Sequence, residues 1–225
     1  MKKFLRSLGI LLMGITGAVT LLGGVGTTCV ALNPEKYESM KAIASLQWLY
    51  LLYVLVGVAL GLVGIRATIL LVKGRENAEK SALFTLIAGV VVGGVHMATS
   101  RALRGSSMPV DGVVYITALT LVVFLLFQLP RLKEMALFKK DFAEKSDNAG
   151  GMTAITIGLL TLGVQYWAGP THLMGGTNYA DAFHNALTIS GASLILLGIG
   201  LIAWNISAIR SLLTHQARAW RQISD

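Results

Sequence analysis

Three histidines and one aspartate are the residues whose types and spacing could carry chemistry. Asp181 and His184 are three residues apart, which places both on one face of a helix. His172 precedes Asp181 by nine residues, and His96 lies in an apolar run far upstream. Neutral imidazoles and a carboxylate suit copper, zinc or iron, and a pair of histidines can ligate haem. The sequence therefore predicts a metal or haem site made of His96, His184, Asp181 and His172.

The same residues also fit an interpretation without a ligand. A loop histidine such as His172 is commonly solvated, His184 can form a hydrogen bond at the start of its helix, and His96 can bond to a hydroxyl of a neighbouring helix. Metal or haem binding and structural polar contacts both stay open at this point. No HExxH, CxxC or P-loop motif occurs, and the lone Cys29 excludes an intrachain disulfide. No residue is predicted to be catalytic, and this favours a protein that is not an enzyme.

The elements that must position these residues are apolar helices. Of the 225 residues, 54% are hydrophobic and 13% are charged, whereas an average soluble domain is about 25% charged. The apolar runs reach the ~20 residues that a helix needs to cross a ~30 Å hydrocarbon core. We therefore predict an all-α, polytopic integral membrane protein that forms a single membrane domain over 1–225, a six-helix bundle. The six predicted transmembrane helices cover 5–32, 46–72, 82–100, 110–129, 152–167 and 182–209.

The lysines and arginines predict how the helices are oriented. With the N-terminus inside, fifteen of them fall on inner segments and four fall on outer loops. This positive-inside bias predicts that both termini are cytoplasmic, in a multi-pass protein of a bacterial-type plasma membrane. The first apolar run is expected to be retained as a helix rather than removed as a signal peptide. The inner loop 131–151 separates four helices from two, either as a linker between subdomains or as a plain solvated loop.

The net charge of +8 is explained by basic residues that bracket the spans. Because they form no single basic stripe, they indicate anionic lipid headgroups and exclude nucleic acid as a partner. Arg101 and Arg104, on the outer side, are the candidate contacts for an anion or a lipid headgroup. The tail 210–222 is expected to form a short interfacial helix. An aromatic belt is expected at one outer boundary, from Trp48, Tyr50 and Tyr53.

Glycines predict where the helices approach one another. Gly57 and Gly61, and likewise Gly89 and Gly93, form GxxxG steps that allow close helix packing. His96 lies on the same helical stripe as Gly89 and Gly93, so we expect it to face a neighbouring helix rather than lipid. All eleven acidic residues lie in loops or at helix ends, which leaves His96 as the ionisable group within a span. This argues against an ion-coupled pump or carrier.

The last two predicted helices, about a quarter of the chain, resemble a known family. The residues that carry the resemblance are 155–161, the Ala-Gly-Pro-Thr-His-Leu-Met-Gly-Gly segment 168–176, the Tyr-Ala-Asp-Ala-Phe segment 179–183 and Ile189-Ser190. They resemble the final two helices of haem-copper oxidase subunit I, in which a histidine follows a proline near the outer end of the penultimate helix. His96-Met97 is similar to the copper-ligand helix of that family. The resemblance implies a haem or copper cofactor held by the outer histidines.

The chain also departs from the family's pattern. It has no His-x-His triplet, and its outer loop is shorter and lacks the family's paired arginines. The family needs six ligating histidines and this chain has four. A complete oxidase is therefore excluded, and the resemblance implies a truncated relative or a subunit beside such an enzyme.

Three functional interpretations follow. The first is a non-catalytic subunit or scaffold of a membrane complex, including a respiratory or redox complex. Its partners would be membrane lipids and either other membrane subunits or a second copy of the chain. The second is a membrane redox protein that holds haem or copper at the outer histidines. The third is a small-solute or lipid carrier, for which the glycine-rich stretch 23–26 would be the unwound segment.

Overall fold

The chain is almost entirely helical where its structure is described, which confirms the predicted all-α class. The computed structural model describes residues 2–135, 137–138, 148–167, 173–174 and 177–205. The helices are α1 (Lys2–Gly26), α2 (Thr28–Leu32), the 3-10 helices η1 (Pro34–Lys36) and η2 (Glu38–Leu46), α3 (Gln47–Val72), α4 (Ala78–Arg104), α5 (Val110–Phe127), α6 (Pro130–Lys133), α8 (Ala149–Leu162), α9 (Val164–Trp167), α10 (Tyr179–Ala182) and α11 (His184–Asn205). A small antiparallel hairpin joins β1 (Leu173–Met174) to β2 (Thr177–Asn178).

Five helices of the described chain are long and apolar enough to cross a membrane, so the protein has the character of a multi-pass membrane protein. These candidate spans are Lys2–Leu32, Met40–Val72, Ala78–Arg104, Val110–Phe127 and His184–Trp204. The helix predicted over 152–167 is divided into α8 and α9 by a turn at Gly163. With 14 residues, α8 is about 21 Å long, which is shorter than a ~30 Å hydrocarbon core.

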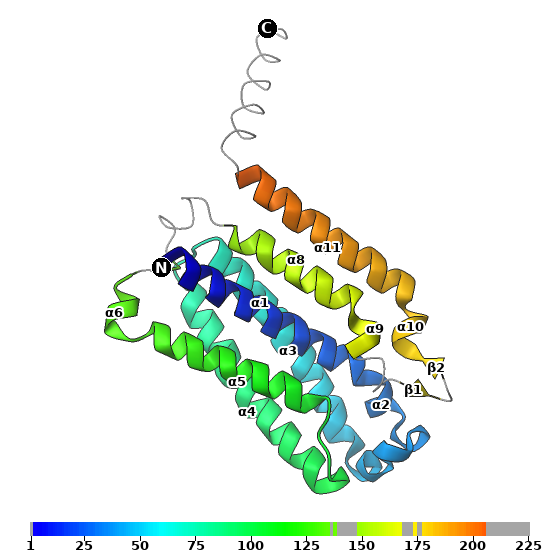
Figure 1. The fold of residues 1–225 in the computed structure, drawn as a ribbon. Helices are drawn as coiled ribbons and strands as arrows, with labels where there is room; N and C mark the ends of the chain where they lie inside the picture. The colour runs from blue at the N-terminus through cyan, green and yellow to red at the C-terminus, as the bar shows by residue number, and fades with distance from the viewer. Residues whose placement is uncertain (1, 136, 139–147, 168–172, 175–176, 206–225) are drawn as a thin grey trace, which may run out of the picture.

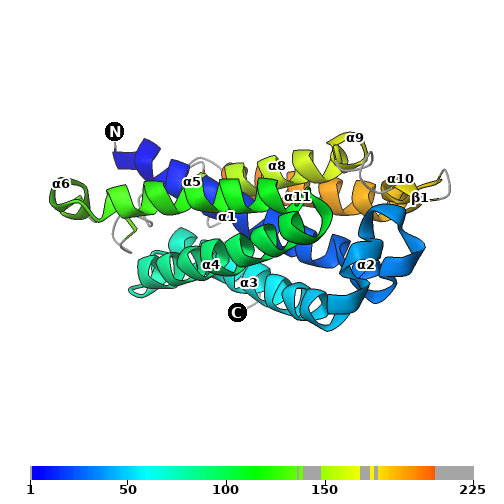
Figure 2. The ribbon, with the colours of Figure 1, turned by 90° about the horizontal axis from the view of Figure 1, so that it is seen from below.

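The helices lie side by side along one direction (Figures 1 and 2). A bundle of α1, α3, α4 and α5 forms the main body. Helices α8 and α11 pack against each other, and α8 also packs against α1. The N-terminus, α6 and the last turn of α11 lie at one end of the molecule, and α2, α10 and the β-hairpin lie at the other (Figure 1). The connections that the structure describes therefore lie at two opposite ends of the stacked helices, as expected for a membrane-spanning bundle.

Glycines set the contact between α1 and α3. A Cβ placed on Gly17 would be 2.9 Å from the backbone of Gly64, and one placed on Gly24 would be 3.2 Å from the backbone of Gly57. Between these two levels, a Cβ on Gly61 would be 2.6 Å from the backbone of Leu21. Real Cβ atoms essentially never come within 3.0 Å of another heavy atom, so at Gly17 and Gly61 the two backbones are too close for a side chain to fit without a shift.

The α8–α11 pair repeats this arrangement. A Cβ on Gly158 would be 2.7 Å from the carbonyl oxygen of Gly191, and one on Gly151 would be 2.7 Å from that of Gly198. In both antiparallel pairs the contacting glycines are seven residues apart on each helix. The sequence around them is also similar, because 57–65 and 191–199 have the same residue at five of nine aligned positions. The fold thus contains one glycine-paired hairpin twice.

The four glycines of the predicted packing steps all lie next to another helix. Gly57 and Gly61 face α1, as described above. A Cβ on Gly89 would be 3.0 Å from a methyl group of Thr117, and one on Gly93 would be 2.8 Å from a methyl group of Val114. The second GxxxG step therefore accommodates side chains of α5, whereas the first meets the backbone of α1.

Arg6 is the largest fully buried side chain of the described chain, with no exposed surface. Its guanidinium donates hydrogen bonds of 2.9 Å to the carbonyl oxygens of Leu71 and Val72, at the C-terminus of α3, and to that of Leu137. It also lies over the ring of Phe138, 5.8 Å from the centroid. The terminal carbonyls of a helix lack intrahelical partners and carry partial negative charge, so a cation stabilises them. In the sequence analysis, Arg6 contributed only to the positive-inside count of lysines and arginines.

Some predictions concern residues outside the described part of the chain. These are the interfacial helix over 210–222, the middle of the 131–151 loop, and His172.

Candidate functional site

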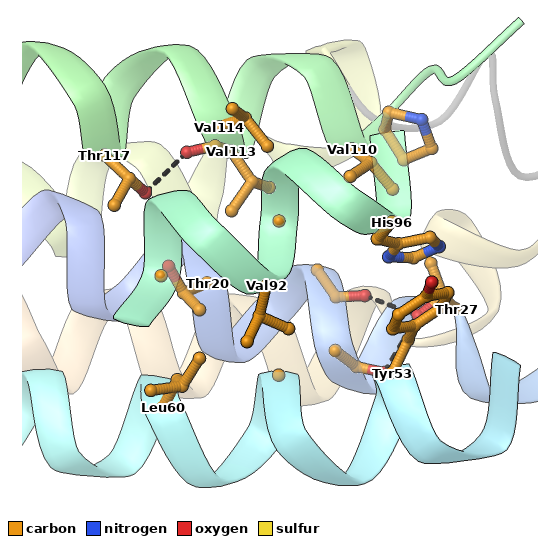
Figure 3. Close-up of a pocket in the computed structure, with 16 residues that line it drawn as sticks. Thr20, Thr27, Tyr53, Leu60, Val92, His96, Val110, Val113, Val114 and Thr117 are labelled. Atoms are coloured by element: carbon orange, nitrogen blue, oxygen red, sulfur yellow. Dashed lines mark hydrogen bonds between the residues drawn. The ribbon is translucent and has the colours of Figure 1, made fainter. Parts of the chain in front are cut away.

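His96 lies near the C-terminal end of α4 and packs against two tyrosines of α3 (Figure 3). Its imidazole is stacked on Tyr53 with 4.3 Å between ring centroids, and it meets the ring of Tyr50 edge-on at 5.3 Å. The tyrosine hydroxyls are hydrogen-bonded to Ser100 Oγ at 2.9 Å and to Thr99 Oγ1 at 3.2 Å. Within the described chain, no protein group forms a hydrogen bond with the half-buried imidazole of His96. Its contacts with α3 are aromatic.

The imidazole of His96 borders a cavity of about 70 Å³ inside the four-helix bundle (Figure 3). Side chains and glycines of α1, α3, α4 and α5 all line it. His96, Tyr53 and Thr27 lie together toward one end, and Thr117 lies at the other (Figure 3). The remaining side chains of the wall are aliphatic apart from Thr20 and Pro109, and none of the lining residues is charged. The cavity is therefore a neutral, amphipathic space.

Arg101 belongs to a polar cluster where α4 meets α5. The α4 helix ends at Arg104 and is followed by Gly105, whose φ of 70° is left-handed and favours glycine, and the chain then turns back into α5. Arg101 donates hydrogen bonds to Ser107 Oγ at 2.8 Å, to Asp111 Oδ2 at 3.0 Å and to the Tyr115 hydroxyl at 3.2 Å. Ser107 also donates to Asp111. This candidate headgroup ligand is thus already paired with a carboxylate of its own chain.

Arg104 occupies a different environment one turn later. It donates hydrogen bonds to the Met40 sulfur at 3.0 Å and to the Met108 carbonyl at 3.3 Å. Its Nε is buried and has no hydrogen-bond partner among the described residues. Arg104 therefore joins the start of α5 to η2, and it has no carboxylate partner in this part of the structure.

The predicted residues of the last helix lie at its exposed beginning. The Nδ1 atom of His184 is hydrogen-bonded to Gln165 Oε1 at 3.0 Å, and this bond links α11 to α9. The side chain of Asp181, in α10, is exposed. His184 thus takes part in a polar contact between α9 and α11.

The structure does not bring His96 together with His184. Helix α4 packs against α3 and α5, whereas α11 packs against α8, on the far side of α1 (Figures 1 and 2). The predicted site needed the third and sixth helices to be neighbours, and the glycine-paired hairpins place α1 and α8 between them. Across the described ranges, no group of three or more His, Cys, Asp or Glu side chains is placed to hold a metal ion.

Sequence reasoning missed the aromatic partners of His96. It assigned Tyr50 and Tyr53 to an aromatic belt, although their spacing of three residues places both on one face of a helix. It also missed the ion pair between Asp111 and Arg101. The short connection between α4 and α5 brings these two residues together. Comparison of the chain with protein-family models, with curated proteins and with solved structures finds no match.

Proposed function

We propose that this protein is a non-catalytic subunit of a membrane complex, and that it associates with another helix through the outward face of α11. The observation that carries the proposal is the isolation of α11 from the bundle. Among the described elements it packs against α8. Of the most apolar stretch of this helix, 11% is buried, whereas the corresponding value for the span that contains α1 is 39%. A helix so weakly covered has most of its surface available to lipid or to a partner.

The residues on that face favour a partner. Ala186, Ser193 and Gly200 are exposed, lie opposite the α8 contact and are seven residues apart. No heavy atom lies within 4 Å of a Cβ placed on Gly200. Small residues let helix backbones approach closely in a membrane, where apolar side chains gain nothing from leaving lipid. The same spacing of seven joins both glycine-paired hairpins of this chain.

The repeat of the hairpin gives a second argument. In the first copy, α3 packs against α1 on one face and against α4 on another. In the second copy, α11 takes the place of α3 and packs against α8, but no described helix takes the place of α4. A helix from another subunit, or from a second copy of this chain, would complete the second copy.

We infer that α8 and α9 together form a sixth span. Their 19 residues, 149–167, would reach ~28 Å as a continuous helix, close to the ~30 Å of a hydrocarbon core. This count returns the chain to the side on which it begins. The basic residues of the α1 start, of the α3–α4 turn and of α6 then share one side, which supports cytoplasmic termini in a bacterial-type plasma membrane.

The orientation is tested with single cysteines in a Cys29→Ser background. We expect a membrane-impermeant maleimide to label Lys36→Cys and Asn178→Cys in intact cells, and Glu76→Cys after lysis. Labelling of position 76 in intact cells, or protection of position 178, would overturn the six-span arrangement.

The association is tested by disulfide cross-linking in native membranes. We expect Ser193→Cys to form a covalent dimer, or an adduct with one membrane protein, whereas the adjacent exposed position in Ala192→Cys does not. Ser193→Ile should reduce assembly size in detergent by light scattering, while Ala192→Ile should not. Equal behaviour of the two positions would show that α11 faces lipid and would refute the proposed association.

A further inference from the structure

The cavity beside His96 has a polar end, and its walls farther along are mainly aliphatic. The polar end is formed by the imidazole of His96, with Tyr53 and the hydroxyl of Thr27 close by (Figure 3). The hydroxyl of Thr27, in the turn between α1 and α2, donates to the carbonyl oxygens of Gly23 and Gly24 in α1, so it is left with acceptor capacity. Farther along, the wall side chains are aliphatic, as at Val113, apart from Thr20 and Thr117. The space is therefore shaped for a molecule that is itself polar at one end.

The hydrogen-bonding groups of the cavity determine which polar group a ligand must carry. A neutral imidazole has one N–H donor and one acceptor nitrogen. Both nitrogens of His96 are without protein partners in the described chain, and the ring is fixed by its stack on Tyr53. A hydroxyl or a primary amide can donate and accept in the same place, as this end requires. Ions are disfavoured because no charged side chain lines the cavity.

The volume limits the size of the ligand. A dry cavity of ~150 Å³ holds benzene, which has six non-hydrogen atoms. By the same ratio a cavity of about 70 Å³ holds about three such atoms, or two ordered waters at ~30 Å³ each. Toward the start of α1, the bundle interior is crossed by the buried hydrogen bond of 2.8 Å between the hydroxyls of Thr16 and Thr120, which joins α1 to α5. Because this hydrogen bond closes the interior on that side, a ligand would be held beside His96.

We propose that this cavity is a binding site for one small neutral solute of about three or four non-hydrogen atoms, namely a hydroxyl group on a stem of two or three carbons. The polar group hydrogen-bonds to His96, and the stem lies along the aliphatic wall formed by residues such as Val113. The proposal is independent of the association through α11, because it concerns the other side of the bundle.

The test uses the full chain in lipid nanodiscs, with isotope-labelled histidine and tyrosine, and a series of straight-chain alcohols from methanol to n-hexanol. We expect ethanol and n-propanol to shift the nuclear magnetic resonance signals of His96 saturably, and n-hexanol to cause no saturable shift. His184, which is exposed and bonded to Gln165, is the internal control and should not respond. Simple partitioning into lipid would instead rise by about fourfold with each added methylene.

Two variants separate binding from non-specific effects. His96→Phe keeps an aromatic ring against Tyr53 but removes both nitrogens, so the ethanol-dependent shift of the Tyr53 signals should be lost. Val113→Phe fills the cavity and should abolish the shift of the His96 signals. If the shift grows steadily with chain length, or affects His96 and His184 alike, or is absent with every alcohol, the cavity is not a site for this class of solute.

Discussion

The glycine contact between α1 and α3 gives a prediction that can be worked from the structure. A Cβ on Gly61 would lie 2.6 Å from the Cα and N atoms of Leu21, whereas ordinary contacts begin at 3.4 Å. The neighbour is backbone, so no rotamer change can relieve Gly61→Ala. The helices must therefore separate by about 0.8 Å. Each dispersion contact between two atoms contributes ~0.1–0.2 kcal/mol, and a gap of ~0.5–1 Å removes a quarter to a half of that energy.

We therefore expect Gly61→Ala to lower the free energy of unfolding by about 2–3 kcal/mol, in the upper part of the range for overpacked cores. The matched control is Gly94→Ala in α4, because no heavy atom lies within 4 Å of a Cβ placed there. That variant should be neutral or stabilising by up to ~1 kcal/mol, through helix propensity.

The assay is reversible unfolding in mixed micelles as the fraction of denaturing detergent increases, followed by circular dichroism. If Gly61→Ala and Gly94→Ala differ by less than about 0.5 kcal/mol, the scale of ordinary surface substitutions, the close approach of α1 to α3 is refuted.

Three further predictions use the same assay. Arg6→Ala leaves three backbone carbonyls without their donor and should cost about 3–5 kcal/mol, whereas Lys3→Ala, at an exposed position of the same helix, should change little; equal losses would contradict the buried role of Arg6. Asp111→Asn removes the charge opposite Arg101, so it should destabilise the protein at low ionic strength and have no effect at high salt; an effect independent of salt would argue against an ion pair. Thr120→Val removes a buried hydroxyl pair that joins α5 to α1 and should cost about 1 kcal/mol; unchanged stability would show that the pair contributes nothing.

The helices could be predicted from the sequence because lipid imposes a simple rule on composition. The predicted segments 46–72 and 110–129 agree closely with α3 and α5. The segment 82–100 is too short, since α4 runs from Ala78 to Arg104 and includes polar residues at both ends. Hydropathy detects the part of a helix that lies in hydrocarbon, whereas a helix continues wherever its backbone hydrogen bonds continue.

The sequence allowed the candidate residues to be picked by type, but it did not predict which residues contact them in the fold. His96 stands out because it is an ionisable group well inside an apolar run, and that signal needs no knowledge of contacts. Its assignment to a site with His184 required helix adjacency, which depends on the glycine pairing of four helices. Arg6 illustrates the same limit, because its acceptor carbonyls lie 65, 66 and 131 residues away along the chain.

The repeated hairpin also determines how the described fold is joined together. The glycine-paired segments of α3 and α11 share five of nine aligned residues, and α1 and α8 precede them in the same order. Within each hairpin the helices touch through their backbones, because glycines face backbone atoms of the neighbouring helix. Between the hairpins α8 packs mainly on α1, so this interface sets how the first hairpin is oriented relative to the second.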